Sequence, residues 1–176
     1  MPQQEISEIL DGSLCDSETT FRAFQERLKE NTYTRDENQK SHFCVFFLPY
    51  DPKNKKVFLV HHKKSGFWIA PGGHIDTGES VVQAVNRETR EELGVENAFD
   101  ESSKPFLFTI CPIENAVQAC KIHFDIWYLL KTDGTNFNID PAEFLDTKWM
   151  TIEEARKIVT VPENLKALEA IERLYL

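Results

Sequence analysis

The segment at residues 73–95 constrains this chain more than any other, and its sequence is GHIDTGESVVQAVNRETREELGV. The pattern predicts a helix that begins near Ser80 and carries its valines on one apolar arc. Glu88, Glu91 and Glu92 fall together along the edge of that arc. Carboxylates crowded in this way repel one another on a bare helix, and a divalent cation would remove that cost. Because hard oxygen ligands suit Mg²⁺ and Mn²⁺, the segment predicts a metal site.

Arg87 is placed to join this helix to the loop before it. It stands eight residues after Glu79 and four before Glu91. We interpret it as a structural clamp between the loop carboxylate and the helix. Taken singly, each of these glutamates would fit a solvated helix face. The whole set at these spacings favours a functional site instead.

The spacing resembles the Nudix box: glycine, five residues, glutamate, seven residues, Arg-Glu, an apolar residue, any residue, Glu-Glu, any residue, glycine and an apolar residue. These positions are carried here by Gly73, Glu79, Arg87, Glu88, Glu91, Glu92, Gly94 and Val95. Thr89 stands where the family usually has an aliphatic residue, and its methyl group can still pack. The strand and turn before the box also resemble the family, at Phe67, Trp68, Pro71 and Gly72. The resemblance covers residues 42–160.

The resemblance carries expectations about fold and chemistry. It implies the α/β/α Nudix fold, in which a mixed β-sheet lies between helices. It also implies a hydrolase that cleaves phosphoanhydrides with Mg²⁺ or Mn²⁺. By similarity to the family, Glu88 and Glu92 are the leading metal ligands. Glu91 would be a third ligand, and the Gly72 carbonyl would be a backbone ligand.

The residue that serves as general base could come either from the box or from a later loop, and the sequence leaves both alternatives open. Glu143 lies in DPAEFLDTKW, a stretch that resembles the family's mobile late loop, and it is the leading candidate outside the box. An ordinary surface glutamate is an equally good interpretation of Glu143, and Glu114 is a further candidate. The expected catalytic residues are therefore Glu88, Glu91, Glu92, Glu143 and Arg87.

The resemblance to the family implies a class of substrates, but it does not identify the individual substrate within that class. The family hydrolyses a nucleoside diphosphate linked to another moiety. Pro112 lies near the proline that marks ADP-ribose hydrolases, which places ADP-ribose or a nucleotide sugar slightly ahead of nucleoside triphosphates and dinucleotide polyphosphates. The basic residues before the Trp68 strand have two interpretations. They would either attract an anionic substrate or simply form a solvated turn. Aromatic side chains would stack on a base or pack in the core. The expected substrate-binding residues are Lys63, Lys64, Trp68, His74 and Trp127.

Three histidines keep other functions open. His42, His74 and His123 resemble part of the pattern in isopentenyl diphosphate isomerase, a Nudix-fold enzyme in which histidines bind a metal. That isomerase carries a catalytic cysteine where this chain has Gly72, so isomerisation is the distant alternative. The histidines would touch metal or phosphate, or would be hydrogen-bonded residues at strand ends. A catalytically silent nucleotide-binding module is the other alternative, and the complete acidic set argues against it.

Length and charge limit what remains. At 176 residues the chain fits one domain, with residues 1–40 as a helical and polar extension and residues 41–176 as the Nudix domain. A formal charge of −9 argues against general binding to nucleic acid or anionic membranes. The sequence shows no apolar run of membrane-spanning length and no secretory stretch, so we expect a cytoplasmic protein. The oligomeric state stays open, with homodimers common among similar proteins.

The remaining elements can be placed coarsely by periodicity. Apolar runs predict strands at 43–48, 57–60, 105–113 and 119–130. Residues 21–28 have helical spacing and precede a flexible run, and capping signals at Thr151 and Pro162 predict the starts of two C-terminal helices. The cysteines lack the CxxC spacing, which favours reduced thiols over disulfides or a zinc site. They are Cys15, Cys44, Cys111 and Cys120.

Overall fold

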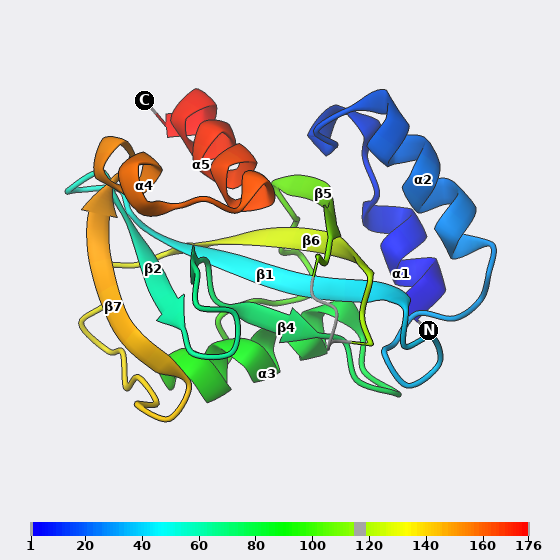
Figure 1. Ribbon diagram of the computed structural model, residues 1–176, viewed down its shortest axis with the longest axis horizontal. Helices are drawn as coiled ribbons and strands as arrows, with labels where there is room; N and C mark the ends of the chain where they lie inside the picture. Colours follow the sequence, from blue (N-terminus) through cyan, green and yellow to red (C-terminus); the bar gives the residue numbers. More distant parts are fainter. Residues whose placement is uncertain (1, 115–118, 176) are drawn as a thin grey trace.

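The computed structural model describes residues 2–114 and 119–175 (Figure 1). Within that part, the strands of one mixed sheet are β1 Ser41–Asp51, β2 Lys56–His62, β3 Trp68–Ile69, β4 Gly72–His74, β5 Leu107–Pro112, β6 Ile122–Lys131 and β7 Phe144–Thr151. The helices are α1 Pro2–Ile9, α2 Glu18–Leu28, α3 Val81–Leu93, α4 Ile152–Ile158 and α5 Pro162–Tyr175, with a 3-10 turn η1 at Gly12–Leu14.

Strand β1 is the centre of the sheet. It pairs in parallel with β6 and antiparallel with both β2 and β4. Beyond these, β6 pairs with β5, and β2 pairs with β3 and β7. Helix α3 covers one face of the sheet, and α4 and α5 cover the other (Figure 1). This arrangement confirms the predicted α/β/α sandwich with a mixed sheet.

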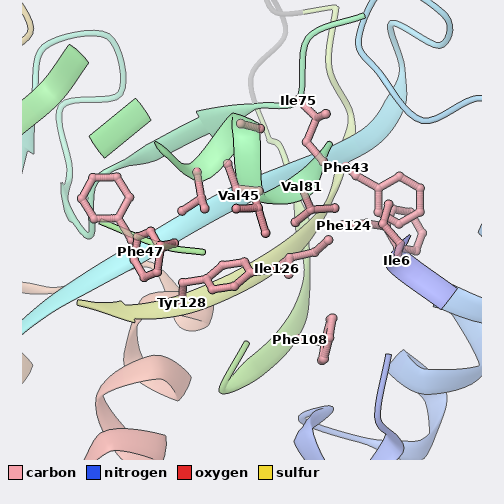
Figure 2. Packing of buried hydrophobic residues seen from close by; sticks show 14 of the residues in the cluster. Ile6, Phe43, Val45, Phe47, Ile75, Val81, Phe108, Phe124, Ile126 and Tyr128 are labelled. Carbon is pink, nitrogen blue, oxygen red and sulfur yellow. The ribbon is translucent and has the colours of Figure 1, made fainter. Parts of the chain in front are cut away.

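The two faces of β1 enter two separate hydrophobic cores, because successive side chains of a strand point to opposite sides. Phe43 and Val45 pack with Val81 of α3, as Figure 2 shows. Leu48 and Tyr50 belong to the second core, under α4 and α5. The helix that carries the box is therefore fixed against the sheet by its apolar arc.

The N-terminal residues pack into the same core as α3. Ile6 of α1 and Phe24 of α2 are fully buried there. The predicted flexible run at residues 31–40 is held by hydrogen bonds instead, because Glu37 accepts from the amides of Tyr33 at 2.7 Å and Thr34 at 2.9 Å. Residues 2–40 thus form part of the folded body.

The predicted strands and capping signals correspond to observed elements, with one exception. Thr151 is the N-cap of α4 and forms a capping box with Glu154, and α5 begins at Pro162. The exception is the stretch predicted as a late loop, since its residues from Phe144 onward form strand β7. Among the described residues, no helix combines the length and the apolar character needed to cross a bilayer.

Candidate functional site

Helix α3 is capped at both ends by its own sequence. Ser80 accepts a hydrogen bond from the Gln83 amide, and the Gln83 side chain accepts one from the Ser80 amide. Gly94 ends the helix with φ 68°, a left-handed conformation that favours glycine. Thr89 is fully buried, and its hydroxyl donates to the Val85 carbonyl at 2.6 Å. That hydrogen bond accommodates threonine at the usually aliphatic position of the box.

Arg87 joins the loop to the helix. Its Nε and Nη2 donate to the two carboxylate oxygens of Glu79 at 2.8 and 2.9 Å. Nη2 also donates to the His74 carbonyl at 2.8 Å. Nη1 donates to Glu88 at 2.7 Å and to Glu91 at 3.3 Å. The hydrogen bond to Glu79 is the main reason that the pKa of Arg87 lies above its usual range. The guanidinium is therefore a cation held in place by three carboxylates and one backbone carbonyl.

Gly72 and Gly73, at the start of the box, let the backbone approach the helix carboxylates. A Cβ atom at Gly73 would collide with the Glu88 carboxylate, and one at Gly72 would collide with the Val45 carbonyl. Gly72 also has φ 148°, which side chains rarely adopt. The Gly72 amide donates to Glu92 Oε2 at 2.7 Å. Both glutamates thus lie directly against the start of β4, where the chain bends into the strand at Gly72 and Gly73.

The carboxylates at this turn are removed from water. Glu92 is only 6% exposed, and its burial, together with the nearby Glu88 charge, raises its pKa well above the usual range. Burial also raises the pKa of Glu88, although the hydrogen bond from Arg87 opposes that shift. Glu91 is more open, with 51% of its side chain exposed. Crowded and desolvated carboxylates favour a neutralising partner.

This donor set fits a hard divalent cation. Glu88 and Glu92 offer carboxylate oxygens beside one backbone turn, and Glu91 lies one residue away at the rim. Oxygen ligands of this kind suit Mg²⁺ or Mn²⁺. The Gly72 carbonyl remains a predicted backbone ligand of the same site.

Lys63 ties the segment before β7 to the turn after β2. Its ammonium donates to the carbonyls of Pro141 at 2.7 Å and Ala142 at 3.0 Å, and its amide donates to the Glu143 carbonyl at 3.2 Å. The Glu143 charge contributes to the raised pKa of Glu92, after burial and the Glu88 charge. The Glu143 charge therefore influences a carboxylate of the box. Lys63 uses its hydrogen bonds to hold the segment at residues 141–143. Glu114 lies exposed beyond the end of β5.

The other predicted substrate-binding residues have different surroundings. Lys64 is exposed on the turn before β3. Trp68 is partly exposed and stacks on His61, with ring centroids 5.2 Å apart and an interplanar angle of 15°. Trp127 is fully buried, stacks on Phe46, and donates from Nε1 to a threonine hydroxyl at 2.9 Å. No face of the Trp127 indole is open to a base, so it is a core residue.

The three histidines meet in one place, at neighbouring positions of β1, β4 and β6. His42 and His123 are partners in the parallel register of β1 and β6, and His74 is the β4 partner of Cys44. The ring centroids lie 4.8 Å apart for His42 and His74, 4.9 Å for His42 and His123, and 5.2 Å for His74 and His123. Cys120 Sγ lies 4.0 Å from His74 Nε2.

All three rings are neutral near pH 7. Burial, followed by the neighbouring rings of His123 and His42, lowers the pKa of His74 to about 3. Burial likewise lowers the pKa of His123 to about 4, and it lowers the pKa of His42 as well. The cysteines are free, with Cys44 buried and the other three partly exposed. Cys120 was not predicted as a neighbour of the histidines, because the contact joins residues 46 apart in the sequence, Cys120 and His74.

Comparison with known proteins identifies the family. A family model of the NUDIX domain matches residues 40–171. The chain therefore belongs to the Nudix family. Nudix hydrolase 6 of Arabidopsis thaliana is 33% identical over 170 residues, covering 89% of this chain and 54% of that protein. CTP pyrophosphohydrolase of Escherichia coli K12 is 30% identical over 111 residues, covering 63% of this chain and 75% of that protein. The chain spans 54% of Nudix hydrolase 6 and only 27% of Nudix hydrolase 19, chloroplastic, from the same plant.

Solved structures of the same fold are also similar. The NUDIX domain of Shewanella oneidensis NrtR, in a cocrystal with ADP ribose, has a TM-score of 0.58 at 21% identity, covering 85% of this chain and 98% of that chain. The Ap4A hydrolase of C. elegans has a TM-score of 0.58 at 21% identity, covering 76% of this chain and 98% of that chain. At these identities the likeness shows the Nudix fold.

Proposed function

We propose that the chain is a divalent-metal-dependent hydrolase that cleaves the phosphoanhydride of a nucleoside diphosphate linked to another moiety. One observation carries the proposal: Glu88 and Glu92 lie desolvated against the Gly72–Gly73 turn, with Arg87 fixed beside them. Family membership supports it, because the matched domain contains this whole arrangement.

The residues have separate tasks in this proposal. Glu88, Glu92 and the Gly72 carbonyl hold the divalent ion, with Glu91 as a further ligand. When bound, such ions shield phosphate oxygens, lower the pKa of a bound water and stabilise the leaving phosphate. Arg87 positions the glutamates and does not react. Glu143 is the proposed general base, because Lys63 holds its segment in place through three hydrogen bonds and its charge contributes to the raised pKa of Glu92.

Substrate contacts are assigned from exposure. Lys64 is exposed and would attract phosphate oxygens, and the partly exposed Trp68 would contact the base, with His61 and Lys148 already against its ring. His74 contributes through its backbone carbonyl, which accepts from Arg87. Lys63 serves indirectly, because its ammonium already bonds two carbonyls of the segment before Glu143.

ADP-ribose or a nucleotide sugar remains slightly favoured as the substrate. The similar NrtR domain was crystallised with ADP ribose, and other similar proteins are named for CTP and Ap4A. The test is a panel of ADP-ribose, nucleotide sugars, nucleoside triphosphates and dinucleotide polyphosphates with Mg²⁺ and with Mn²⁺. Release of phosphate or nucleotide from one class supports the proposal. Silence across the panel, with the protein folded, would favour a nucleotide-binding module instead.

A further inference from the structure

A second cluster of metal-ligating side chains lies beside the box, and the proposed hydrolysis does not use it. One ligand atom from each of His42, His74, Cys120 and His123 lies within 4.8 Å of the others. The residues come from β1, β4, β6 and the segment just before β6. Strand pairing fixes the three histidines, so three of the four ligands belong to the sheet.

His42 has the hydrogen bonding of a metal ligand. Its side chain is fully buried, and Nδ1 lies 3.0 Å from the Asn38 carbonyl oxygen. Because a carbonyl only accepts, Nδ1 must carry the proton and Nε2 must present a lone pair. That Nε2 is buried and has no hydrogen-bond partner among residues 2–114 and 119–175. A histidine whose other nitrogen donates to a backbone carbonyl is the usual arrangement around a bound metal.

A second buried nitrogen points to the same conclusion. His123 Nε2 is also buried, and no described residue forms a hydrogen bond with it. A buried polar atom left unsatisfied costs about 1–3 kcal/mol, and two such atoms face one cluster. A single ion bound between them would satisfy both.

The ligand types select the ion. Three imidazoles and one thiol form a Cys-His₃ set, and such nitrogen and sulfur donors suit Zn²⁺ rather than Mg²⁺. Tetrahedral Zn–N bonds of about 2.0 Å and a Zn–S bond of about 2.3 Å would place a nitrogen and the sulfur roughly 3.5 Å apart. The separation between Cys120 Sγ and His74 Nε2 is 4.0 Å, so a small closure of the cysteine segment completes the geometry.

We propose that His42, His74, His123 and Cys120 bind one Zn²⁺ ion at a site distinct from the carboxylate site. The ion would tie β1, β4 and β6 together directly after the Gly72–Gly73 turn. Binding converts the Cys120 thiol to a thiolate and releases its proton. The proposal does not depend on the identity of the substrate or on hydrolysis itself.

The test follows metal binding without any nucleotide. The full chain is stripped with a chelator and titrated with Zn²⁺ and with Co²⁺ in millimolar Mg²⁺, which keeps the carboxylate site filled. We expect one tight equivalent, tetrahedral Co²⁺ absorption, and a thiolate-to-cobalt charge-transfer band. Zn²⁺ should also raise the melting temperature, because it binds the folded state.

Variants identify the ligands. Cys120→Ser should lose the charge-transfer band and weaken Zn²⁺ binding by at least the ~100-fold that outer-shell changes reach. His74→Gln should weaken binding similarly, and it avoids the fully buried His42, whose replacement could prevent folding. Cys15→Ser is the matched control and should keep both the band and the affinity. Glu92→Gln should leave the Zn²⁺ equivalent in place.

Two results would overturn the assignment. One is the absence of any Zn²⁺ or Co²⁺ equivalent in the presence of Mg²⁺. The other is a bound equivalent that survives in both Cys120→Ser and His74→Gln but is lost in Glu92→Gln. Neither result would contradict the hydrolase proposal, which the nucleotide panel tests separately.

Discussion

Arg87 binds Glu79 through two parallel hydrogen bonds, Nε to Oε1 at 2.8 Å and Nη2 to Oε2 at 2.9 Å. Paired contacts of this kind fix both position and orientation. The same guanidinium reaches Glu88 and the His74 carbonyl. The loop, the turn and the helix of the box are therefore held by one side chain.

This pair should be strongly coupled in stability. Both side chains are largely buried, at 18% and 20% exposure. A double-mutant cycle of Arg87→Ala and Glu79→Ala, followed by urea denaturation, should give a coupling free energy of about 1–3 kcal/mol. Arg87→Lys should recover only part of it, because an ammonium lacks the planar fork.

The control is a surface pair with the same two-bond contact. Arg156 donates to both Glu172 oxygens, at 3.3 and 2.7 Å, but the side chains are 38% and 45% exposed. Its cycle should give at most about 1 kcal/mol. Equal coupling in the two cycles would show that Arg87 does not act as a clamp.

The N-terminal helix α1 contributes a second cap to the box helix. Glu5 accepts from the amides of Val81 at 2.8 Å and Val82 at 3.2 Å, which are free donors of the first helical turn. Glu5→Ala should lower the free energy of unfolding by about 1 kcal/mol, as the loss of a helix cap does. Glu8→Ala, on the same helix, should change it by less than about 0.5 kcal/mol. A larger effect from Glu8 would contradict this assignment.

The neutral histidines predict acid sensitivity in chelated protein. The unfolded chain takes up protons below about pH 6.5, whereas folding holds the pKa of His123 at about 4 and that of His74 at about 3. The stabilisation is therefore complete above about pH 6.5, declines progressively below it, and is fully lost only when the pH has fallen through about 4 for His123 and about 3 for His74. Between pH 6.5 and 5, each ring should lower the free energy of unfolding by up to about 2 kcal/mol.

Carboxylates oppose this trend, so the comparison needs a variant. Burial raises the pKa of Glu92 and of Asp125, and their protonation stabilises the folded state as the pH falls. The free energy of unfolding of the parent and of His123→Gln is measured by urea denaturation at each pH. The difference between the two values cancels the contribution of the carboxylates. The parent should lose more stability between pH 6.5 and 5. Equal losses in the two proteins would refute a buried neutral His123.

Glu143 should affect turnover rather than binding. As a general base, its replacement by glutamine should lower kcat by about 10²–10⁴-fold with little change in KM. Glu114→Gln should leave kcat nearly unchanged, because Glu114 lies exposed beyond β5. The reverse outcome, with kcat lost only in Glu114→Gln, would reassign the base. Steady-state kinetics on the best substrate of the panel decide between them.

The helix of the box and its partners could be predicted because their signals are local. The Ser80 cap, the apolar arc and the Gly94 terminus all lie within one stretch. Strand β7 could not be predicted in the same way. Most of its side chains are exposed or partly exposed, so it lacks apolar alternation, and its partner β2 is distant in sequence.

The same distinction separates the predicted from the missed site residues. The spacing of Arg87 and Glu79 was legible as an i, i+8 relationship across a loop. The contact of Cys120 with the histidines depends on the register that sets His42 beside His123, and no spacing encodes it. For Trp127, the sequence predicted correctly that the residue lies in a strand. It did not predict that the side chain would be fully buried in the core.

The most direct test of the account is the rate of phosphoanhydride hydrolysis by Glu92→Gln in Mg²⁺. Glutamine keeps an oxygen that can accept from the Gly72 amide, so the fold should persist in circular dichroism. The rate should fall by at least about 100-fold through loss of a metal ligand, whereas the exposed Glu153→Gln should keep the parental rate. Near-normal turnover by folded Glu92→Gln would contradict the proposed carboxylate metal site.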